Sequence, residues 1–213
     1  MGDRTEVPAV ACISRVIVPE KLVKREYGAH RLFWNAFPGC PTGVVQPFLF
    51  RQETAAPVND GEAAYIIQSR DAPAWDEVMG IRVVSCSPVE TTFRRDDLFW
   101  FRLLASPVRR FMHPEKIRER GHEVVKRVSK RVWVEDWMLR RADQGGFQLI
   151  EMIFDLSTKL ASARNRDKFE LPAVQFDGLL KVSDPARFAD AWRNGIGTKK
   201  SFGFGLLSIK RYR

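Results

Sequence analysis

The sequence is poor in cysteine, histidine and tyrosine, with three of each among 213 residues, and it has no long apolar run. Cys12, Cys40 and Cys86 are an odd number without metal-ligand spacing, so neither a disulfide framework nor a zinc site is predicted. No run approaches the roughly 18 apolar residues of a transmembrane helix, and the N-terminus lacks the layout of a signal peptide. We therefore expect a cytoplasmic protein with no membrane partner, no metal and no cofactor.

Positive charge is abundant and unevenly distributed. The formal net charge is +9, yet residues 1–93 carry −2, residues 94–141 carry +7 and residues 142–213 carry +4. Arginines often stand in pairs, as in Arg94-Arg95 and Arg109-Arg110, and guanidinium groups suit phosphate oxygens. This pattern favours two units, of which mainly the second binds a polyanion; an ordinary solvated surface is the alternative.

Residues 11–93 predict six elements in the order β-α-β-β-α-β, the ferredoxin-like or RNA-recognition arrangement. Hydrophobic periodicity and Pro/Gly breakers place them at 11–18 (strand), 21–37 (helix), 48–51 and 64–67 (strands), 75–79 (short segment) and 81–93 (strand).

The same series then restarts. Strands are predicted at 98–104, 147–154, 173–182 and 205–210, and helices at 134–143 and 184–194. Asp184 is expected to cap the last helix and Pro185 to occupy its first position. The sequence thus predicts an α+β protein with two tandem ferredoxin-like (RNA-recognition-motif-like) domains, at residues 8–94 and 97–213.

The first predicted helix carries His30, with Tyr27 three residues earlier and so on the same face. The apolar residues of this helix are expected to form a core stripe while Tyr27 and His30 face outward. A histidine with a reference pKa near 6.5 is a workable general acid or base; an ordinary surface histidine is the alternative. His113 and His122 lie in a strongly charged segment, where surface positions or phosphate contacts are expected instead.

Four glycines and two lysines gather between the last helix and the last strand, in the stretch from 195 to 205 (GIGTKKSFGFG). Such a loop lets backbone N–H groups and cations approach phosphates closely. It has neither P-loop spacing nor enough following residues for a dinucleotide-binding unit. An RNA-backbone loop is the favoured interpretation, and a tight helix-to-strand connection is the alternative.

Five motifs in order carry a resemblance to a known family. They are 27–38 (YGAHRLFWNAFP, similar to Tyr-x-x-His-x-x-x-Trp-x-x-Phe-Pro), 47–51 (PFLFR), 101–107 (FRLLASP, similar to Phe-Arg-Leu-x-Ala-x-Pro), 130–132 (KRV) and the glycine-rich 195–208. Through them the chain resembles the CRISPR-associated CasE (Cse-type) endoribonuclease family of type I-E systems.

The resemblance implies a metal-independent endoribonuclease that cuts CRISPR precursor RNA within the repeat hairpin. The ribose 2′-OH would attack the phosphate, leaving a 2′,3′-cyclic phosphate and a 5′-OH. The product would stay bound, as mature guide RNA, in the Cascade surveillance complex, with the other Cascade subunits as partners. The catalytic residues would be His30 as general acid or base, Tyr27 as an orienting group, and Lys200 as a cation that neutralises the developing charge. Lys199 is a second candidate for that cation, and a half-buried aromatic covering the helix face is the alternative for Tyr27.

RNA binding is expected mainly from the second unit. The candidates are Arg102, Lys130, Arg131, Arg164, Arg166 and Lys168, together with Gly195, Gly197, Lys199, Lys200, Ser201, Gly203 and Gly205 of the glycine-rich loop. A solvent-facing position is the alternative for each single cation. Two other functions stay open: a hairpin-binding scaffold subunit that no longer cuts, and a general RNA-binding protein unrelated to CRISPR.

Overall fold

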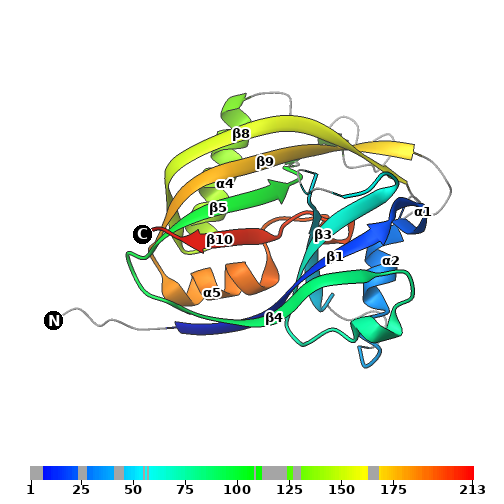
Figure 1. The fold of residues 1–213 in the computed structure, drawn as a ribbon. Coiled ribbons are helices and arrows are strands. Elements are labelled where there is room, and N and C mark those ends of the chain that lie inside the picture. Colours follow the sequence, from blue (N-terminus) through cyan, green and yellow to red (C-terminus); the bar gives the residue numbers. More distant parts are fainter. Residues whose placement is uncertain are drawn as a thin grey trace.

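Two four-stranded antiparallel sheets form the framework of the chain (Figure 1). The structure, a computed structural model, describes residues 7–23, 28–40, 46–54, 56, 58–107, 109–111, 124–126, 131–162 and 168–213. Within this part of the chain, no helix is both long and apolar enough to cross a membrane.

The first sheet has the strand order β2-β3-β1-β4. Its elements are β1 (Val7–Pro19), α1 (Glu20–Val23), α2 (Gly28–Trp34), β2 (Phe48–Gln52), β3 (Glu62–Ser69), η1 (Trp75–Glu77) and β4 (Arg82–Phe93). Phe33 of α2 is fully buried and meets the rings of Phe50, Tyr65 and Trp75 edge-on. This aromatic cluster holds α2 against one face of the sheet.

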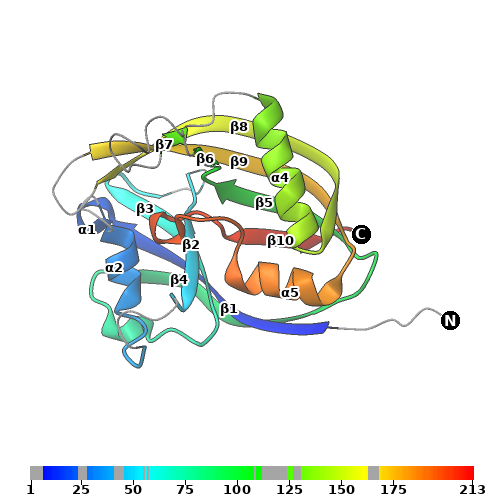
Figure 2. The ribbon, with the colours of Figure 1, turned by 180° about the vertical axis from the view of Figure 1, so that it is seen from behind.

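The second sheet has the strand order β10-β5-β9-β8. Its elements are β5 (Leu98–Ala105), α4 (Arg131–Gln144), β8 (Phe147–Ser162), β9 (Lys168–Val182), α5 (Pro185–Asn194) and β10 (Leu207–Arg211), with the one-turn η2 (Lys200–Phe202) before β10. Both helices lie on one face of this sheet (Figure 2), where alternate residues of β5 such as Phe101 and Leu103 join the core.

The predicted fold class is confirmed, because each sheet places its first and third strands in the centre, as ferredoxin-like folds do. Asp184 caps α5 as expected: its carboxylate accepts a hydrogen bond from the backbone N–H of Arg187 at 3.1 Å.

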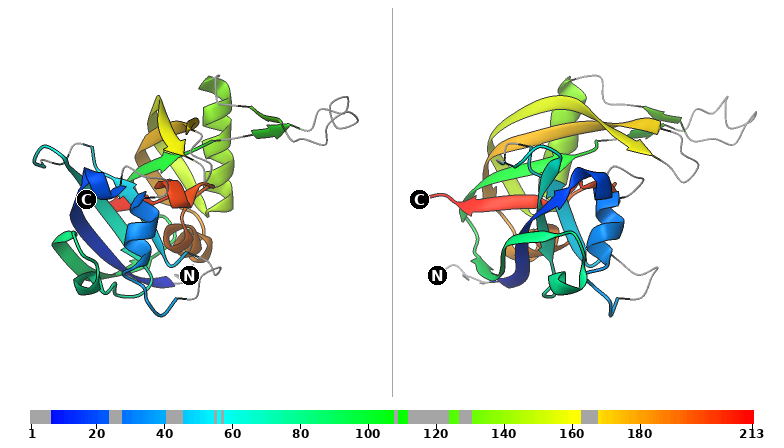
Figure 3. Two further views of the ribbon diagram at one scale, coloured as in Figure 1. Left: turned by 90° about the vertical axis from the view of Figure 1, so that its right-hand side faces the viewer. Right: turned by 45° about the vertical axis from the view of Figure 1, so that its right-hand side comes forward.

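Several element predictions need correction. The single helix expected over 21–37 is described as α1 and α2, and the second helix of the first unit is only the 3₁₀ turn η1. The two-stranded antiparallel sheet of β6 (Arg109–Phe111) and β7 (Val124–Lys126) was not predicted from the sequence. It projects from the second sheet (Figure 3).

The two sheets are tied together by α5. Ala9 of β1 and Phe93 of β4 belong to the same core cluster as Phe188 and Trp192 of α5. In addition, the buried Gln68 side chain at the end of β3 donates a hydrogen bond to the backbone carbonyl of Trp192 at 2.7 Å. Apolar packing and a buried polar contact together fix the last turn of α5 against the first sheet.

Gly178 of β9 provides a test of the strand packing. It pairs with Met152, next to a bulge in β8 between Leu149 and Glu151, and a Cβ atom at Gly178 would collide with the backbone carbonyl of Glu151. We expect Gly178→Ala to lower the free energy of unfolding by about 1–3 kcal/mol, as over-packing does, measured by urea denaturation. Gly39→Ala is the matched control, because a Cβ there meets nothing within 4 Å. Equal stability of the two variants would contradict the described packing.

Candidate active site

His30 lies on α2 and is fixed by two rings and a glutamine. Its Nε2 and the Gln46 Oε1 are 3.1 Å apart, and the Gln46 Nε2 donates to the carbonyl of Phe48 at 2.6 Å. Its ring centroid is 5.4 Å from that of Trp34 and 5.8 Å from that of Phe48. His30 is therefore half-buried between α2 and the start of β2, rather than simply facing outward as the helical pattern predicted.

The environment of His30 favours the neutral imidazole. Burial lowers the pKa of His30 below its ordinary value of 6.5, and the hydrogen bond with Gln46 raises it in part. Because the pKa of His30 is lower in the folded protein than in the unfolded chain, the contribution of neutral His30 to stability is complete above pH 6.5. That contribution is lost progressively as the pH falls below 6.5 toward the folded-state pKa. At neutral pH the imidazole of His30 is therefore largely uncharged.

The glycine-rich segment between α5 and β10 is a tightly packed connection. Gly195 has φ = +74°, and a Cβ atom there would lie 2.7 Å from the carbonyl oxygen of Gly205 and 2.8 Å from the Leu49 side chain on β2. The Ile196 N–H also donates to the Gly205 carbonyl at 2.8 Å. The tight-connection alternative thus accounts for these two glycines, which let the segment close on itself against the first sheet.

This packing brings Lys200 to the same part of the molecule as His30. The turn η2, which begins at Lys200, contacts both α2 and β2. Burial lowers the pKa of Lys200, and the nearby positive charge of Arg70 lowers it further. Arg70 in turn donates to the side-chain oxygen of Asn194, at the end of α5, at 2.7 Å. Two cations are thus held near each other where an anion would relieve their repulsion.

Lys199 and Lys200 are adjacent in sequence but differ in environment. Lys199 is exposed, adopts the left-handed conformation (φ = +65°), and places its ammonium 6.0 Å from the ring centroid of Phe202. Lys200 is half-buried. Gly197 and Gly203 also have positive φ angles within this loop, and Ser201 lies in η2 between them.

The other predicted RNA-binding residues fall into three groups. Arg102 lies on β5 and is paired with Asp177 of β9 at 2.7 Å, with its side chain 46% exposed. Arg131 begins α4 and Lys168 begins β9. Tyr27, Lys130, Arg164 and Arg166 lie outside the described residues, as do His113 and His122.

Sequence reasoning missed Gln46 and Arg70. Gln46 stands just before β2 and has no pattern that distinguishes it from a loop residue. Arg70 follows β3 and has no neighbouring Lys or Arg in the sequence that would mark it as part of a basic motif. The one available signal for Gln46 was its position immediately before the Pro47-Phe48-Leu49-Phe50-Arg51 motif.

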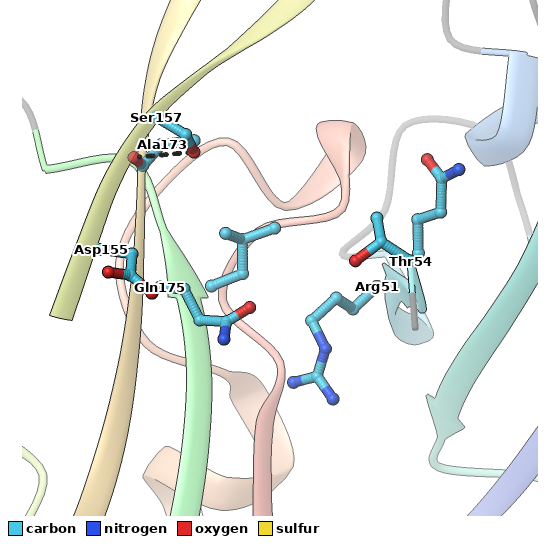
Figure 4. A pocket seen from close by; sticks show the side chains of 8 residues that line it. Arg51, Thr54, Asp155, Ser157, Ala173 and Gln175 are labelled. Atoms are coloured by element: carbon cyan, nitrogen blue, oxygen red, sulfur yellow. Dashed lines mark hydrogen bonds between the residues drawn. The ribbon is translucent and has the colours of Figure 1, made fainter. Parts of the chain in front are cut away.

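A separate cavity of about 310 Å³ lies between the end of β2 and the face of the second sheet that α4 and α5 leave uncovered. Figure 4 shows Arg51 and Thr54 across from Asp155 and Gln175. Arg51 is buried, forms an ion pair with Glu53 at 2.8 Å, and donates to the carbonyl of Arg102 at 3.4 Å. The described residues contain no group of three His, Cys, Asp or Glu side chains that could hold a metal ion.

Comparison with known proteins identifies the family. A family model described as "CRISPR associated protein" matches residues 7–211. The chain belongs to this family. The resemblance seen in the five motifs is thereby confirmed.

Two curated relatives of this CRISPR-associated protein span nearly its whole length. It is 27% identical over 202 residues to the CRISPR system Cascade subunit CasE of Escherichia coli K12, covering 92% of this chain and 98% of the relative. It is 28% identical over 201 residues to the CRISPR-associated endoribonuclease Cse3 of Thermus thermophilus, covering 86% of this chain and 82% of the relative. The structure of Thermus thermophilus Cse3 bound to an RNA representing a pre-cleavage complex has a TM-score of 0.77 at 22% identity, covering 94% of this chain and 98% of that one. That likeness supports the fold.

The contact between Gln46 and His30 predicts how the pKa of His30 in this CRISPR-associated protein responds to substitution of Gln46. Because this hydrogen bond raises the pKa of His30, Gln46→Leu should lower that pKa further, and Gln46→Glu should raise it by adding a carboxylate. An NMR titration of the imidazole C–H signals measures both. Asn35→Ala, an exposed change just after α2, should leave the titration unchanged. A shift of the same sign in both Gln46 variants would contradict the described contact.

Proposed function

We propose that this protein is an endoribonuclease that cleaves CRISPR precursor RNA in the repeat hairpin and retains the mature guide RNA as a subunit of a Cascade complex. The observation that carries the proposal is the position of His30 on α2, held by Gln46 just before β2, beside the turn η2 that begins at Lys200. The relatives named Cascade subunit CasE and endoribonuclease Cse3 support the substrate class and the partners.

The proposed chemistry needs no metal ion. The 2′-OH upstream of the scissile phosphate loses its proton and attacks phosphorus, and the bond to the 5′-oxygen breaks as that oxygen gains a proton. The products are a 2′,3′-cyclic phosphate and a 5′-OH. Three tasks follow for the protein: to accept a proton, to donate a proton, and to stabilise the negative charge of the phosphorane.

His30 suits the proton transfer, because burial lowers its pKa and so keeps a basic nitrogen free of its proton at neutral pH. Gln46 orients the ring, since it ties Nε2 to the backbone of β2 through its own amide. Tyr27, three residues before His30, is proposed to orient the ring or the 2′-OH. Lys200 and Arg70 supply positive charge for the phosphorane.

The rest of the RNA is proposed to lie along the basic second unit. A-form RNA is recognised mainly by shape and backbone, and residues 94–213 carry a net charge of +11. Arg102, Lys130, Arg131, Arg164, Arg166 and Lys168 are the proposed phosphate contacts, with the glycine-rich loop beside the cut. Arg102 meets phosphate only in competition with its ion pair to Asp177.

His30→Ala tests the proposed reaction. The rate of single-turnover cleavage of a labelled repeat hairpin in EDTA should fall by roughly 10²–10⁴-fold, the contribution of one positioned acid or base. Hairpin affinity should stay nearly unchanged, because the imidazole is neutral. Asn35→Ala is the control, and an RNA with a single 2′-deoxy at the cut site should resist the unaltered protein.

The alternative function, a scaffold that binds without cutting, predicts tight hairpin binding with no cleavage by the unaltered protein. Joint loss of binding and cleavage in His30→Ala would refute the catalytic assignment. A requirement for added divalent cation would refute the side-chain mechanism.

The two lysines should separate kinetically. Lys200→Ala removes the half-buried cation beside Arg70 and should lower the single-turnover rate by about 10²-fold, as loss of one transition-state contact does. Lys199→Ala removes an exposed cation and should mainly weaken RNA binding. The slope of the logarithm of the binding constant against the logarithm of the salt concentration should become smaller by about one, the contribution of one phosphate contact. Cleavage rates and binding at several salt concentrations measure both effects, and a reversed assignment of rate and affinity would contradict the geometry.

A further inference from the structure

Two of the three cysteines face each other across strands of the first sheet. The Sγ atoms of Cys12 on β1 and Cys86 on β4 are 3.4 Å apart. In the strand register Cys12 lies opposite Pro88 and Cys86 opposite Ser14, so the two cysteines are diagonal neighbours on one face of the sheet. They are 74 residues apart in sequence, which is why cysteine spacing gave no sign of the pair.

The surroundings of the pair hold the two sulfur atoms in place. The hydroxyl of the fully buried Ser14 donates to the Cys86 Sγ at 3.3 Å and accepts from the indole N–H of Trp75 at 2.9 Å. A disulfide has an S–S length of about 2.05 Å, so bond formation requires a further approach of only ~1.4 Å. Diagonal neighbours lie about 7–8 Å apart, slightly beyond the Cα separation of roughly 4.4–6.8 Å in disulfides. Closure therefore also requires a small shift of the exposed edge strand β4 toward β1.

The two thiols are not equivalent. Cys86 is exposed on the edge strand β4, whereas Cys12 is buried at 6% exposure. Burial and the contact with Cys86 raise the pKa of the Cys12 thiol to about 11. An oxidant in solution therefore meets Cys86 first, and Cys12 is placed to react second.

We propose that Cys12 and Cys86 are a modification site, forming a reversible intramolecular disulfide with a low-molecular-weight disulfide of the glutathione class as oxidant. The thiolate of Cys86 attacks one sulfur of the oxidant and releases one thiol, giving a mixed disulfide. Cys12 loses its proton to solvent, attacks the Cys86 sulfur and releases the second thiol. In total, two protein thiols and one small disulfide give one protein disulfide and two small thiols.

The bond would fasten an edge strand to the interior of its sheet. Among the described strands β4 pairs only with β1, and residues 82–88 of β4 are exposed. A cross-link that closes a loop of this length restricts the unfolded chain strongly. The oxidised form should therefore be the more stable one. This inference needs no RNA and stands apart from the proposed nuclease activity.

The test uses the reduced full-length protein, treated with oxidised glutathione. Thiols titrated under denaturing conditions should fall from three to one, and a non-reducing digest should yield a cross-linked peptide that contains Cys12 and Cys86. The midpoint of thermal unfolding should rise by roughly 5–10 °C, and dithiothreitol should reverse the change.

Variants supply the controls. Cys40→Ser should keep the response, whereas Cys86→Ser and Cys12→Ala should each abolish it. A stable glutathione adduct on Cys86 with Cys12 still reduced would overturn the proposal, as would disulfide-linked dimers. Peptide mapping of the unaltered protein decides between these outcomes even if the buried Cys12→Ala variant does not fold.

Discussion

The arrangement of the site depends on one buried hydrogen bond, from the Gln68 side chain to the carbonyl of Trp192. The last carbonyls of a helix have no partner within the helix. In α5, Gln68 of the first sheet supplies a hydrogen-bond donor for one of these carbonyls, that of Trp192. Loss of this bond would leave buried polar groups unpaired, at a cost of about 1–3 kcal/mol for each. Because the glycine-rich segment starts where α5 ends, the bond also fixes where Lys200 lies relative to α2.

The surroundings of His30 and of Lys200 differ in their electrostatics. His30 sits among the rings of Trp34 and Phe48, where burial disfavours a positive charge. Lys200 lies close enough to Arg70 for the positive charge of Arg70 to lower its pKa. Lys200 belongs to the second unit and Arg70 to the first, and Arg70 is held by its hydrogen bond to Asn194 at the end of α5. The first unit thus supplies His30 and Arg70 and the second supplies Lys200, so the candidate site lies where the two units meet.

The sequence predicted what depends on local chemistry. Asp184 and Pro185 mark the start of α5 through capping and a fixed φ angle, and the structure has both. Gln46 and Arg70 were missed because their contacts join residues 16 and 124 positions apart, and no local pattern encodes such pairs. The two lysines could not be separated, because the left-handed backbone of Lys199 arises from the packing of the loop. Assignments at Tyr27, Lys130, Arg164 and Arg166 stay predictions.

In the proposed reaction the paired cations favour the transition state without opposing the retention of product. A phosphodiester carries one negative charge, the dianionic phosphorane carries two, and the 2′,3′-cyclic phosphate again carries one. Lys200 and Arg70 therefore favour the phosphorane over both the substrate and the product, which is the condition for catalysis. They do not distinguish substrate from product, so cleavage removes no attraction at this point. Under the proposed function the cut would leave the hairpin contacts of the second unit unchanged, so the guide RNA would remain bound.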